Sequence, residues 1–399
     1  MFCACAQRNA PLAAAARELS SLEACDEAAH LRSYTVPWLP LCWRSRERRL
    51  MHSTFLAAWA CRSCAVEGER ANCACANPYS FAPRRRFSSA VRATLQDEET
   101  ETLCGCEVLH RTATLAGGVR LHFVESGPAT GPTVLLLHGF PDLHLSWRLQ
   151  LPALSAAGYR AVAVNMRGYG RSSAPQGVRE YSRDAVVSDL LGLLDLLVGV
   201  DGAVALLVGH DWGAAVAWAV AELAPERVAR LATLNVPHPD VFRRTLRESA
   251  EQRRRSWYIL AFQLPWLPER LLKARDCRAL RRVLGGSSAP PPPALIEQYV
   301  AAFTRPGGGG FQAPLNFYRA AARGLWPSSL RRIEAPVLVL WGEQDPYLEA
   351  AMATPPAHLA PNARVVRIPH ASHWVHWEEP ETVNRELLAL LREAATQES

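Results

Sequence analysis

The chain has 399 residues, a formal net charge of +6 and 49% hydrophobic residues. This length exceeds one ordinary domain but suits one large core with an insertion and an N-terminal extension. Lysine occurs once, so 43 of the 44 basic residues are arginine, and no basic face with interleaved aromatic residues accompanies them. The composition therefore argues against a nucleic-acid partner.

Residues 1–106 form a cysteine-rich segment that holds ten of the 11 cysteines. Their spacing lacks the repeated C-x-x-C pattern of zinc sites, so we predict no metal site. The most apolar run, residues 50–66, is interrupted by His52 and Arg62 and falls short of the roughly twenty apolar residues that a spanning helix needs. No signal peptide is recognisable. We therefore expect a disordered N-terminal extension.

The first part of the core, residues 107–236, alternates predicted strands and helices. The predicted elements are a hairpin over 110–125, strands over 133–137 and 159–165, and a helix over 183–198. Ser182 is placed to cap that helix. Strands that alternate with helices favour an α/β fold with a doubly wound, mostly parallel sheet.

The strand over 133–137 is followed by His138-Gly139-Phe140-Pro141. Gly139 permits a tight turn and Pro141 fixes the next bend, so we expect the backbone N–H of Phe140 to point into the crevice beyond the strand. An N–H group in this position can stabilise an oxyanion. We interpret His138 as a structural residue that holds the loop, with a catalytic role as the alternative.

The strand over 203–208 runs into Gly209-His210-Asp211-Trp212-Gly213, and an alanine-rich, helix-like segment follows. This is the context of a nucleophile elbow, with Asp where most such enzymes carry Ser. A carboxylate needs no base before it attacks an sp³ carbon, so Asp211 is predicted to form an alkyl ester. The N–H of Trp212, at the helix start, is the second predicted oxyanion donor. An ordinary loop is the alternative interpretation of the pentapeptide alone.

Residues 237–333 differ in composition from the segments on either side and are predicted to form a helical lid inserted into the core. Two stretches rich in Pro and Gly, 285–293 and 307–310, are expected to connect its helices. The aromatic residues of the lid are expected to give it an apolar inner surface that binds a lipophilic substrate. Those assigned to substrate binding are Trp257, Phe262, Trp266 and Phe317.

The core resumes at residues 334–399, where two further strands each lead to a candidate catalytic residue. Asp345 follows the strand over 336–341, and His373 follows the strand over 363–368. Together with Asp211 they give the order nucleophile, acid, histidine at the carboxyl ends of three strands, where open α/β sheets bind ligands. We predict that Asp345 orients His373 and that His373 is the base. The rivals within the same motifs are Glu343, His370 and His376.

This combination of motifs resembles the epoxide hydrolase branch of the α/β-hydrolase fold. From about residue 108 to its end, the chain is most similar to the membrane-anchored type 3 and type 4 epoxide hydrolases of vertebrates. The matching motifs are His138-Gly139-Phe140-Pro141, Gly209-His210-Asp211-Trp212-Gly213 and residues 167–172, 262–269, 316–319 and 372–374. The resemblance implies that two lid tyrosines, Tyr258 and Tyr318, hydrogen-bond the epoxide oxygen. It also implies that no cofactor or metal is needed.

Two features depart from the family pattern. The resemblance implies attachment to the endoplasmic reticulum or microsomal membrane, whereas the sequence shows no clear anchor, and its absence would favour the cytoplasm. Asn165 stands where the family commonly has Asp. We expect that difference to change the electrostatics of the loop rather than the chemistry.

The sequence predicts an epoxide hydrolase that converts lipophilic epoxides, fatty-acid epoxides among them, to vicinal diols. Asp211 would form the ester, and a water activated by His373 would hydrolyse it. A lipophilic epoxide and water are the expected partners. One alternative is a haloalkane dehalogenase, which shares the Asp nucleophile but needs halide-binding N–H donors. The other is a non-catalytic hydrolase-like binding protein, which has no use for an ordered triad.

Overall fold

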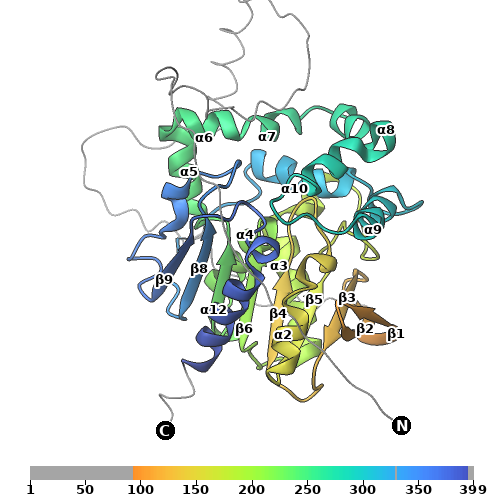
Figure 1. Cartoon of the computed structure of the whole chain (residues 1–399), viewed down its shortest axis with the longest axis vertical. Helices are drawn as coiled ribbons and strands as arrows, with labels where there is room; N and C mark the ends of the chain where they lie inside the picture. Colours follow the sequence, from red (N-terminus) through yellow and green to blue (C-terminus); the bar gives the residue numbers. More distant parts are fainter. Residues whose placement is uncertain (1–92, 329, 394–399) are drawn as a thin grey trace, which may run out of the picture. The chain divides into compact units, whose positions relative to one another are not determined.

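The computed structural model describes residues 93–328 and 330–393 (Figure 1). Within these residues, strands form one sheet in the order β1-β2-β3-β5-β4-β6-β7-β8-β9. Strands β5, β4, β6, β7, β8 and β9 pair in parallel, which confirms the predicted doubly wound α/β sheet. The strands are β1 (Thr94–Leu103), β2 (Cys106–Thr114), β3 (Arg120–Ser126), β4 (Thr133–Leu137), β5 (Arg160–Val164), β6 (Leu206–His210), β7 (Leu231–Leu234), β8 (Val337–Gly342) and β9 (Ala363–Ile368).

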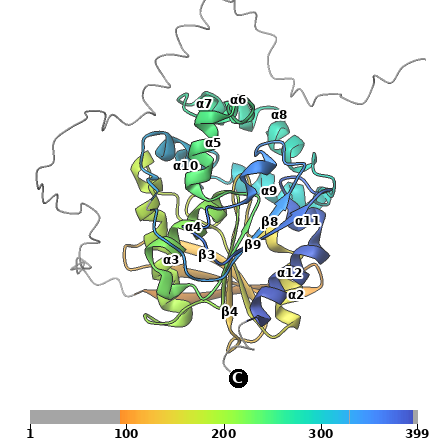
Figure 2. The same ribbon diagram turned by 90° about the vertical axis from the view of Figure 1, so that its left-hand side faces the viewer.

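Helices cover both faces of the sheet (Figure 2). On one face lie α3 (Arg183–Val198) and α4 (Trp212–Leu223), and on the other lie α2 (Leu151–Ala156) and α12 (Pro380–Arg392). Every residue of β4 and β6 is buried, as a parallel strand covered on both faces requires. The shorter segments are α11 (Val375–Glu378), η1 (His144–Trp147), η2 (Val178–Tyr181), η3 (Pro225–Arg227) and η4 (Ala350–Ala353).

Two predicted local features are present at the expected positions. Ser182 caps α3, because its side-chain oxygen accepts a hydrogen bond from the N–H of Ala185 at 3.4 Å. The predicted hairpin is formed by β2 and β3, which pair antiparallel around the turn that contains Gly118. Gly118 has a φ of +78°, a conformation that glycine adopts without the clash other residues meet.

A helical insertion separates β7 from β8, as the composition of residues 237–333 predicts. Figure 1 shows its helices together at one end of the sheet. The stretch 285–292 connects α8 to α9, and 305–311 connects α9 to α10. In the described part of the insertion the helices are α5 (Pro239–Glu248), α6 (Ala250–Arg255), α7 (Trp257–Ala261), α8 (Leu267–Leu284), α9 (Pro293–Thr304) and α10 (Gln312–Ala322).

The boundary predicted at residue 106 is wrong, because the sheet begins with β1 at Thr94. Strand β1 pairs antiparallel with β2, although most of its residues are exposed. Polar contacts support the pair: Asp97 accepts from Arg111 at 2.6 Å, and Glu101 lies 3.0 Å from the His110 ring. A strand held by cross-strand polar pairs lacks the apolar alternation by which strands are predicted from sequence.

The rest of the cysteine-rich segment, and the apolar run over 50–66, lie outside the described residues. Among the residues that are described, no helix has both the length and the apolar character needed to cross a membrane.

The position of β1 leads to a prediction about truncation. Removal of residues 1–92 leaves the whole described sheet intact, so the melting temperature is expected to change by less than about 2 °C. Removal of residues 1–105 also deletes β1 and exposes the edge of β2, and is expected to lower the melting temperature by at least about 3 °C. Scanning calorimetry of both proteins tests this, and equal melting temperatures would show that β1 adds no stability.

Candidate active site

The structure brings the three predicted catalytic side chains together. Asp211 follows β6, Asp345 follows β8, and His373 follows β9. Nδ1 of His373 lies 2.7 Å from Oδ2 of Asp345, and Nε2 of the same ring lies 3.7 Å from Oδ2 of Asp211. One imidazole therefore lies between two carboxylates, in the arrangement expected of a nucleophile, a base and an orienting acid.

Asp211 lies on a strained turn between β6 and α4. Its φ of +49° and ψ of −125° fall in a region that residues with a side chain rarely adopt. A Cβ added to Gly209 would come within 2.4 Å of the Gly213 carbonyl oxygen, and one added to Gly213 would come within 2.1 Å of the Leu137 carbonyl oxygen. The two glycines of the motif are therefore required by close backbone approach, which a strained elbow imposes.

The loop after β4 contacts the Asp211 carboxylate directly. The backbone N–H of Phe140 donates to Oδ1 of Asp211 at 2.6 Å. A Cβ on Gly139 would come within 2.2 Å of the same oxygen, so only glycine allows this approach. Trp212 is the first residue of α4, where helix N–H groups lack intrahelical partners. Oδ1 is therefore held by the predicted oxyanion loop, whereas Oδ2 faces the imidazole of His373.

The orienting acid is fixed by four hydrogen bonds. Asp345 is 2% exposed, and its Oδ2 accepts from His373 and from the side-chain amide of Asn235 at 2.8 Å. Its Oδ1 accepts the backbone N–H groups of Tyr347 at 2.7 Å and Leu348 at 3.0 Å. Asn235 was not predicted as a site residue from the sequence, although it directly follows β7 and so reaches the same edge of the sheet.

The two carboxylates determine the charge of His373. Burial alone lowers the pKa of this imidazole, but the charges of Asp345 and Asp211 and the hydrogen bonds to both raise it to about 10. In turn, burial opposes ionisation of Asp211, while the contacts with His373, the nearby His210 and the Phe140 N–H keep the pKa of this carboxyl below its usual value. The Asp211 carboxyl is therefore ionised and the His373 imidazole is positively charged at neutral pH.

Tyr258 of α7 and Tyr318 of α10 lie next to each other, with ring centroids 6.0 Å apart. Burial and the negative charge of Asp211 raise the pKa of both phenols well above the usual value. Both hydroxyls therefore stay protonated at neutral pH and can act as hydrogen-bond donors. The Tyr318 ring also packs edge-on against Trp212, with centroids 5.1 Å apart, which places it beside the nucleophile motif.

The four predicted substrate-binding residues have different surroundings. Phe262 packs against Phe140 and Tyr318, with centroids 5.8 and 5.1 Å away, so it lies beside the catalytic cluster. Phe317 is 0% exposed and packs against Trp212, so no solvent-accessible part of its ring faces a substrate.

Trp257 and Trp266 are 50% and 62% exposed, which corrects the expectation that they line the inner surface of the lid. Trp266 instead packs against the guanidinium of Arg270, 5.8 Å from the ring centroid. The sequence does not fix the rotational phase of a helix as short as α7, which has five residues, so it could not assign Trp257 to the outer side.

The alternative candidates for the catalytic residues, His138, His370 and Glu343, have other roles or lie on the surface. The ring of His138 is buried and contacts the Gly139 carbonyl at 2.9 Å and the Met166 N–H at 3.2 Å, as expected of a structural residue. His370 is exposed. Glu343 forms a surface ion pair with Arg367 at 3.2 Å. None of these contacts joins the catalytic triad.

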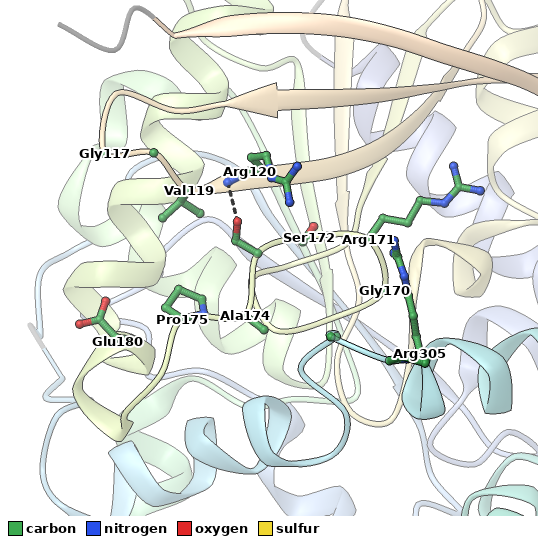
Figure 3. A pocket seen from close by; sticks show the side chains of 15 residues that line it. Gly117, Val119, Arg120, Gly170, Arg171, Ser172, Ala174, Pro175, Glu180 and Arg305 are labelled. Atoms are coloured by element: carbon green, nitrogen blue, oxygen red, sulfur yellow. Dashed lines mark hydrogen bonds between the residues drawn. The ribbon is translucent and has the colours of Figure 1, made fainter.

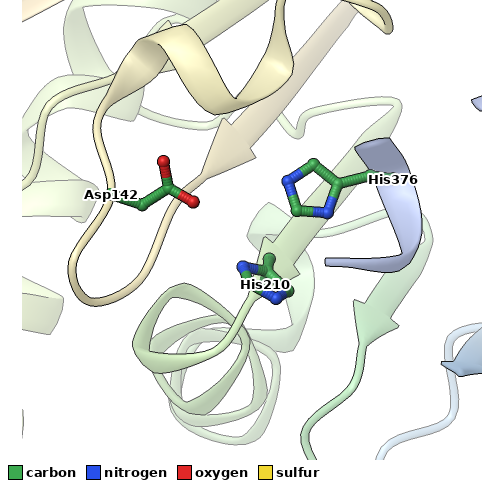
Figure 4. A group of neighbouring side chains, drawn as sticks. All are labelled: Asp142, His210 and His376. Carbon is green, nitrogen blue, oxygen red and sulfur yellow. The ribbon is translucent and has the colours of Figure 1, made fainter. Parts of the chain in front are cut away.

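A buried group of Asp142, His210 and His376 has metal-ligand side chains within 4.8 Å of one another (Figure 4). The hydroxyl of Ser146 lies 2.6 Å from both Oδ2 of Asp142 and Nε2 of His376. His210 donates from Nε2 to the backbone carbonyl of His373 at 2.9 Å. These contacts indicate a hydrogen-bond network that supports the catalytic histidine loop.

Asn165 lies in a separate cluster of buried histidines. Its side-chain oxygen accepts the backbone N–H of His144 at 2.9 Å, and its amide lies 2.9 Å from Nδ1 of His122. Burial, with the neighbouring histidines, lowers the pKa of His122 to about 2, so this ring is neutral and accepts from the amide. A carboxylate could not donate there, so Asn165 suits a neutral histidine cluster at the loop after β5.

A surface hollow of about 520 Å³ lies between the β2–β3 turn, the loop after β5 and the loop after α9 (Figure 3). Glycines and the arginines Arg120, Arg171 and Arg305 line it. None of its lining residues belongs to the predicted catalytic set. The side chain of Asp211, by contrast, is 16% exposed beneath the insertion.

Comparison with known proteins agrees with this geometry. A family model described as the alpha/beta hydrolase fold matches residues 132–380. Epoxide hydrolase 4 of Homo sapiens is 35% identical over 284 residues, which cover 69% of this chain and 76% of the human protein. Epoxide hydrolase 3 of Xenopus tropicalis is 37% identical over 282 residues, with the same two coverages of 69% and 76%.

Solved structures of epoxide hydrolases also match. Epoxide hydrolase A from Mycobacterium thermoresistibile has a TM-score of 0.58 and 33% identity, covering 75% of this chain and 98% of that one. A mutant epoxide hydrolase from Bacillus megaterium, complexed with its naphthyloxy-propanediol product, has a TM-score of 0.62 and 29% identity, covering 69% of this chain and 98% of that one.

The raised pKa of His373 predicts how stability depends on pH. A histidine whose pKa rises from 6.5 to about 10 on folding stabilises the fold fully below pH 6.5, and this stabilisation is lost as the pH rises toward 10. The difference in melting temperature between wild type and His373→Gln should therefore be largest near pH 6.5 and shrink by pH 10. Calorimetry from pH 6.5 to pH 10 tests the direction of this change. A difference in melting temperature that grows with pH would contradict the charged state of His373.

Proposed function

The chain belongs to the α/β-hydrolase family and to its epoxide hydrolase branch, and from that premise we propose that it converts lipophilic epoxides to vicinal diols through an ester on Asp211. The observation that carries the proposal is the Asp211 carboxylate itself. One of its oxygens is held by the Phe140 N–H, and the other faces the imidazole of His373. A carboxylate held this way can attack a strained sp³ carbon without a base.

In the first step, Oδ2 of Asp211 attacks an epoxide carbon and the C–O bond of the ring breaks. Tyr258 and Tyr318 donate hydrogen bonds to the ring oxygen as it gains negative charge. The resulting alkoxide then takes up a proton and becomes the alcohol. Alkylation removes the charge of Asp211, one of the influences that raise the pKa of His373. The imidazolium then releases its proton, which balances the proton taken up by the alkoxide.

In the second step, neutral His373 takes a proton from a water molecule, and the resulting hydroxide attacks the ester carbonyl carbon. The carbonyl oxygen, which was Oδ1 of Asp211, becomes an oxyanion next to the N–H groups of Phe140 and Trp212. Collapse of this intermediate breaks the bond between the carbonyl carbon and the alkyl oxygen, and the leaving alkoxide takes the proton of the newly added hydroxyl, which gives the diol and the Asp211 carboxylate. His373 keeps the proton from water, so the starting state returns.

The surroundings of Asp211 favour a lipophilic substrate. Phe140 and Trp212 adjoin the nucleophile, and Phe262 and Tyr318 pack around them. An apolar, water-poor site strengthens the hydrogen bonds from the phenols. The product bound by the Bacillus megaterium relative is an aryl ether diol, which supports aryl epoxides as well as fatty-acid epoxides as candidates here.

The helical insertion is proposed to act as the lid of this site, since both donor tyrosines lie on it. Attachment to a membrane stays a prediction from the resemblance. The haloalkane dehalogenase alternative is disfavoured because two phenols face the nucleophile region. A pure binding protein is disfavoured because the triad is intact.

Blocking the second step should trap the ester. His373→Gln lacks the base for hydrolysis, whereas attack by Asp211 needs none, so this variant is expected to gain one substrate mass on the peptide that contains Asp211. Intact-mass and peptide mass spectrometry after mixing with styrene oxide, naphthyl glycidyl ether or a long-chain fatty-acid epoxide measures it.

His370→Gln is the matched control, because this histidine belongs to the same motif but is exposed. It should turn over normally without a trapped ester. Normal turnover by His373→Gln, or labelling of another peptide, would overturn the assignment of base and nucleophile.

The two tyrosines distinguish epoxide from halide chemistry. Tyr258→Phe and Tyr318→Phe keep the rings but remove the donors, so each is expected to slow alkylation roughly ten- to a thousandfold, about 1.4–4 kcal/mol. Stopped-flow measurement of ester formation tests this. Full epoxide activity in both variants, or faster halide release than epoxide opening by the wild type, would favour the dehalogenase.

A further inference from the structure

Helix α9 of the insertion contacts the oxyanion loop with two side chains. Tyr299 and Phe303 are four residues apart, so they lie on one face of the helix, and both are buried. The hydroxyl of Tyr299 donates to Oδ1 of Asp142 at 2.6 Å. The Phe303 ring meets the Phe140 ring edge-on, with centroids 6.5 Å apart.

The segment between these contacts carries the oxyanion donor. Phe140 and Asp142 flank Pro141, and the N–H of Phe140 bonds Oδ1 of Asp211 at 2.6 Å. From the core side, the loop is held at His138, whose Nε2 accepts the backbone N–H of Met166, after β5, at 3.2 Å. The insertion therefore fixes this loop from above while the core fixes it from below.

The Asp142 carboxylate is a strong acceptor for the hydrogen bond from Tyr299. It is 1% exposed, and burial raises the pKa of this carboxyl to about 6. Hydrogen bonds from Ser146, Tyr299 and the Leu143 N–H oppose this increase in pKa. Asp142 is therefore mostly ionised at neutral pH, and hydrogen bonds to an ionised acceptor are stronger than those between neutral groups. The bond from Tyr299 is one of the few that this buried charge receives.

The same carboxylate also reaches the catalytic histidine segment. The hydroxyl of Ser146 bridges Asp142 and His376, which lies three residues beyond His373 (Figure 4). The indole of Trp377 donates to the Ser146 carbonyl at 2.9 Å. Asp142 is thus the point at which the insertion, the oxyanion loop and the histidine segment are joined.

We propose that Tyr299 is a positioning residue which, through Asp142, fixes the Phe140 N–H at the oxyanion and so controls the rate of ester hydrolysis. This rests on the proposed function. The N–H bond strengthens when the ester carbonyl oxygen becomes an oxyanion, whereas during alkylation the same oxygen loses negative charge. A displaced N–H therefore slows the second step and leaves the first step little changed.

The test uses the full chain with Tyr299→Phe, which keeps the ring and removes only the hydroxyl. Kinetics are measured with whichever of styrene oxide, naphthyl glycidyl ether and a long-chain fatty-acid epoxide the wild type turns over fastest. Hydrolysis of the ester is expected to slow by at least about tenfold, while its formation stays within about threefold of the wild type. With hydrolysis rate-limiting, kcat and KM should fall together and kcat/KM should stay unchanged.

Tyr181→Phe is the matched control. Tyr181 is also 0% exposed, and its hydroxyl donates to a loop carbonyl, that of Pro175, at 3.0 Å, away from the oxyanion loop. This variant also loses a tyrosine hydroxyl bond, here to a neutral carbonyl, so its melting temperature should fall by no more than that of Tyr299→Phe while its kcat stays at the wild-type value. The double variant Tyr299→Phe/Asp142→Asn should hydrolyse the ester no more slowly than the slower single variant, because Tyr299 acts only through Asp142.

The proposal is overturned if Tyr299→Phe hydrolyses the ester at the wild-type rate, if kcat and kcat/KM fall equally, or if Tyr181→Phe shows the same kinetic defect. These outcomes differ from failure of the proposed function. If the proposed function fails, the wild type itself would form no ester on Asp211 with any of the three epoxides.

Discussion

The site depends on one buried imidazole that lies between two carboxylates, those of Asp345 and Asp211. Burial disfavours a charged ring, and it lowers the pKa of His138 to about 4 and that of His210 to about 3. His373 is buried to a similar degree, yet contact with Asp345 and Asp211 raises its pKa to about 10. Loss of the Asp211 charge on alkylation removes part of that effect. In the proposed mechanism, Asp211 therefore regulates the protonation of His373, the base that later hydrolyses its ester.

The fold makes this contact possible by bringing short loops to one edge of the sheet. Parallel strands β4, β6, β7 and β8 are neighbours in that order, and each is followed by a residue of the site. The strained conformation of Asp211 persists because α4 packs on β6 and β7 behind it, and such strain is kept only where its surroundings fix it. Stability of the buried sheet thus maintains the geometry of a turn that is unfavourable by itself.

The sequence predicts the parts of the site that follow strands directly. Asp211, Asp345 and His373 could be assigned because an apolar run, a turn and an ionisable residue occur in the order of the fold. The insertion was less predictable. Its helices are short and its aromatic residues numerous, so Trp266 could not be told from Phe262 before the packing was known. Asn235 and Tyr299 act through side-chain hydrogen bonds across long sequence distances, which local patterns do not record.

The arrangement around Asp142 shows why neighbouring acids and histidines need not form a second catalytic pair. Asp142 and His376 are both buried, and a direct contact between them would favour a charged imidazole beside His373. The hydroxyl of Ser146 instead donates to Asp142, so its oxygen accepts from Nε2 of His376. Burial then keeps the pKa of His376 well below its usual value, and the ring stays neutral. The Ser146 hydroxyl separates the Asp142 charge from the ring of His376, so that of His210, His373 and His376 only His373 is positively charged.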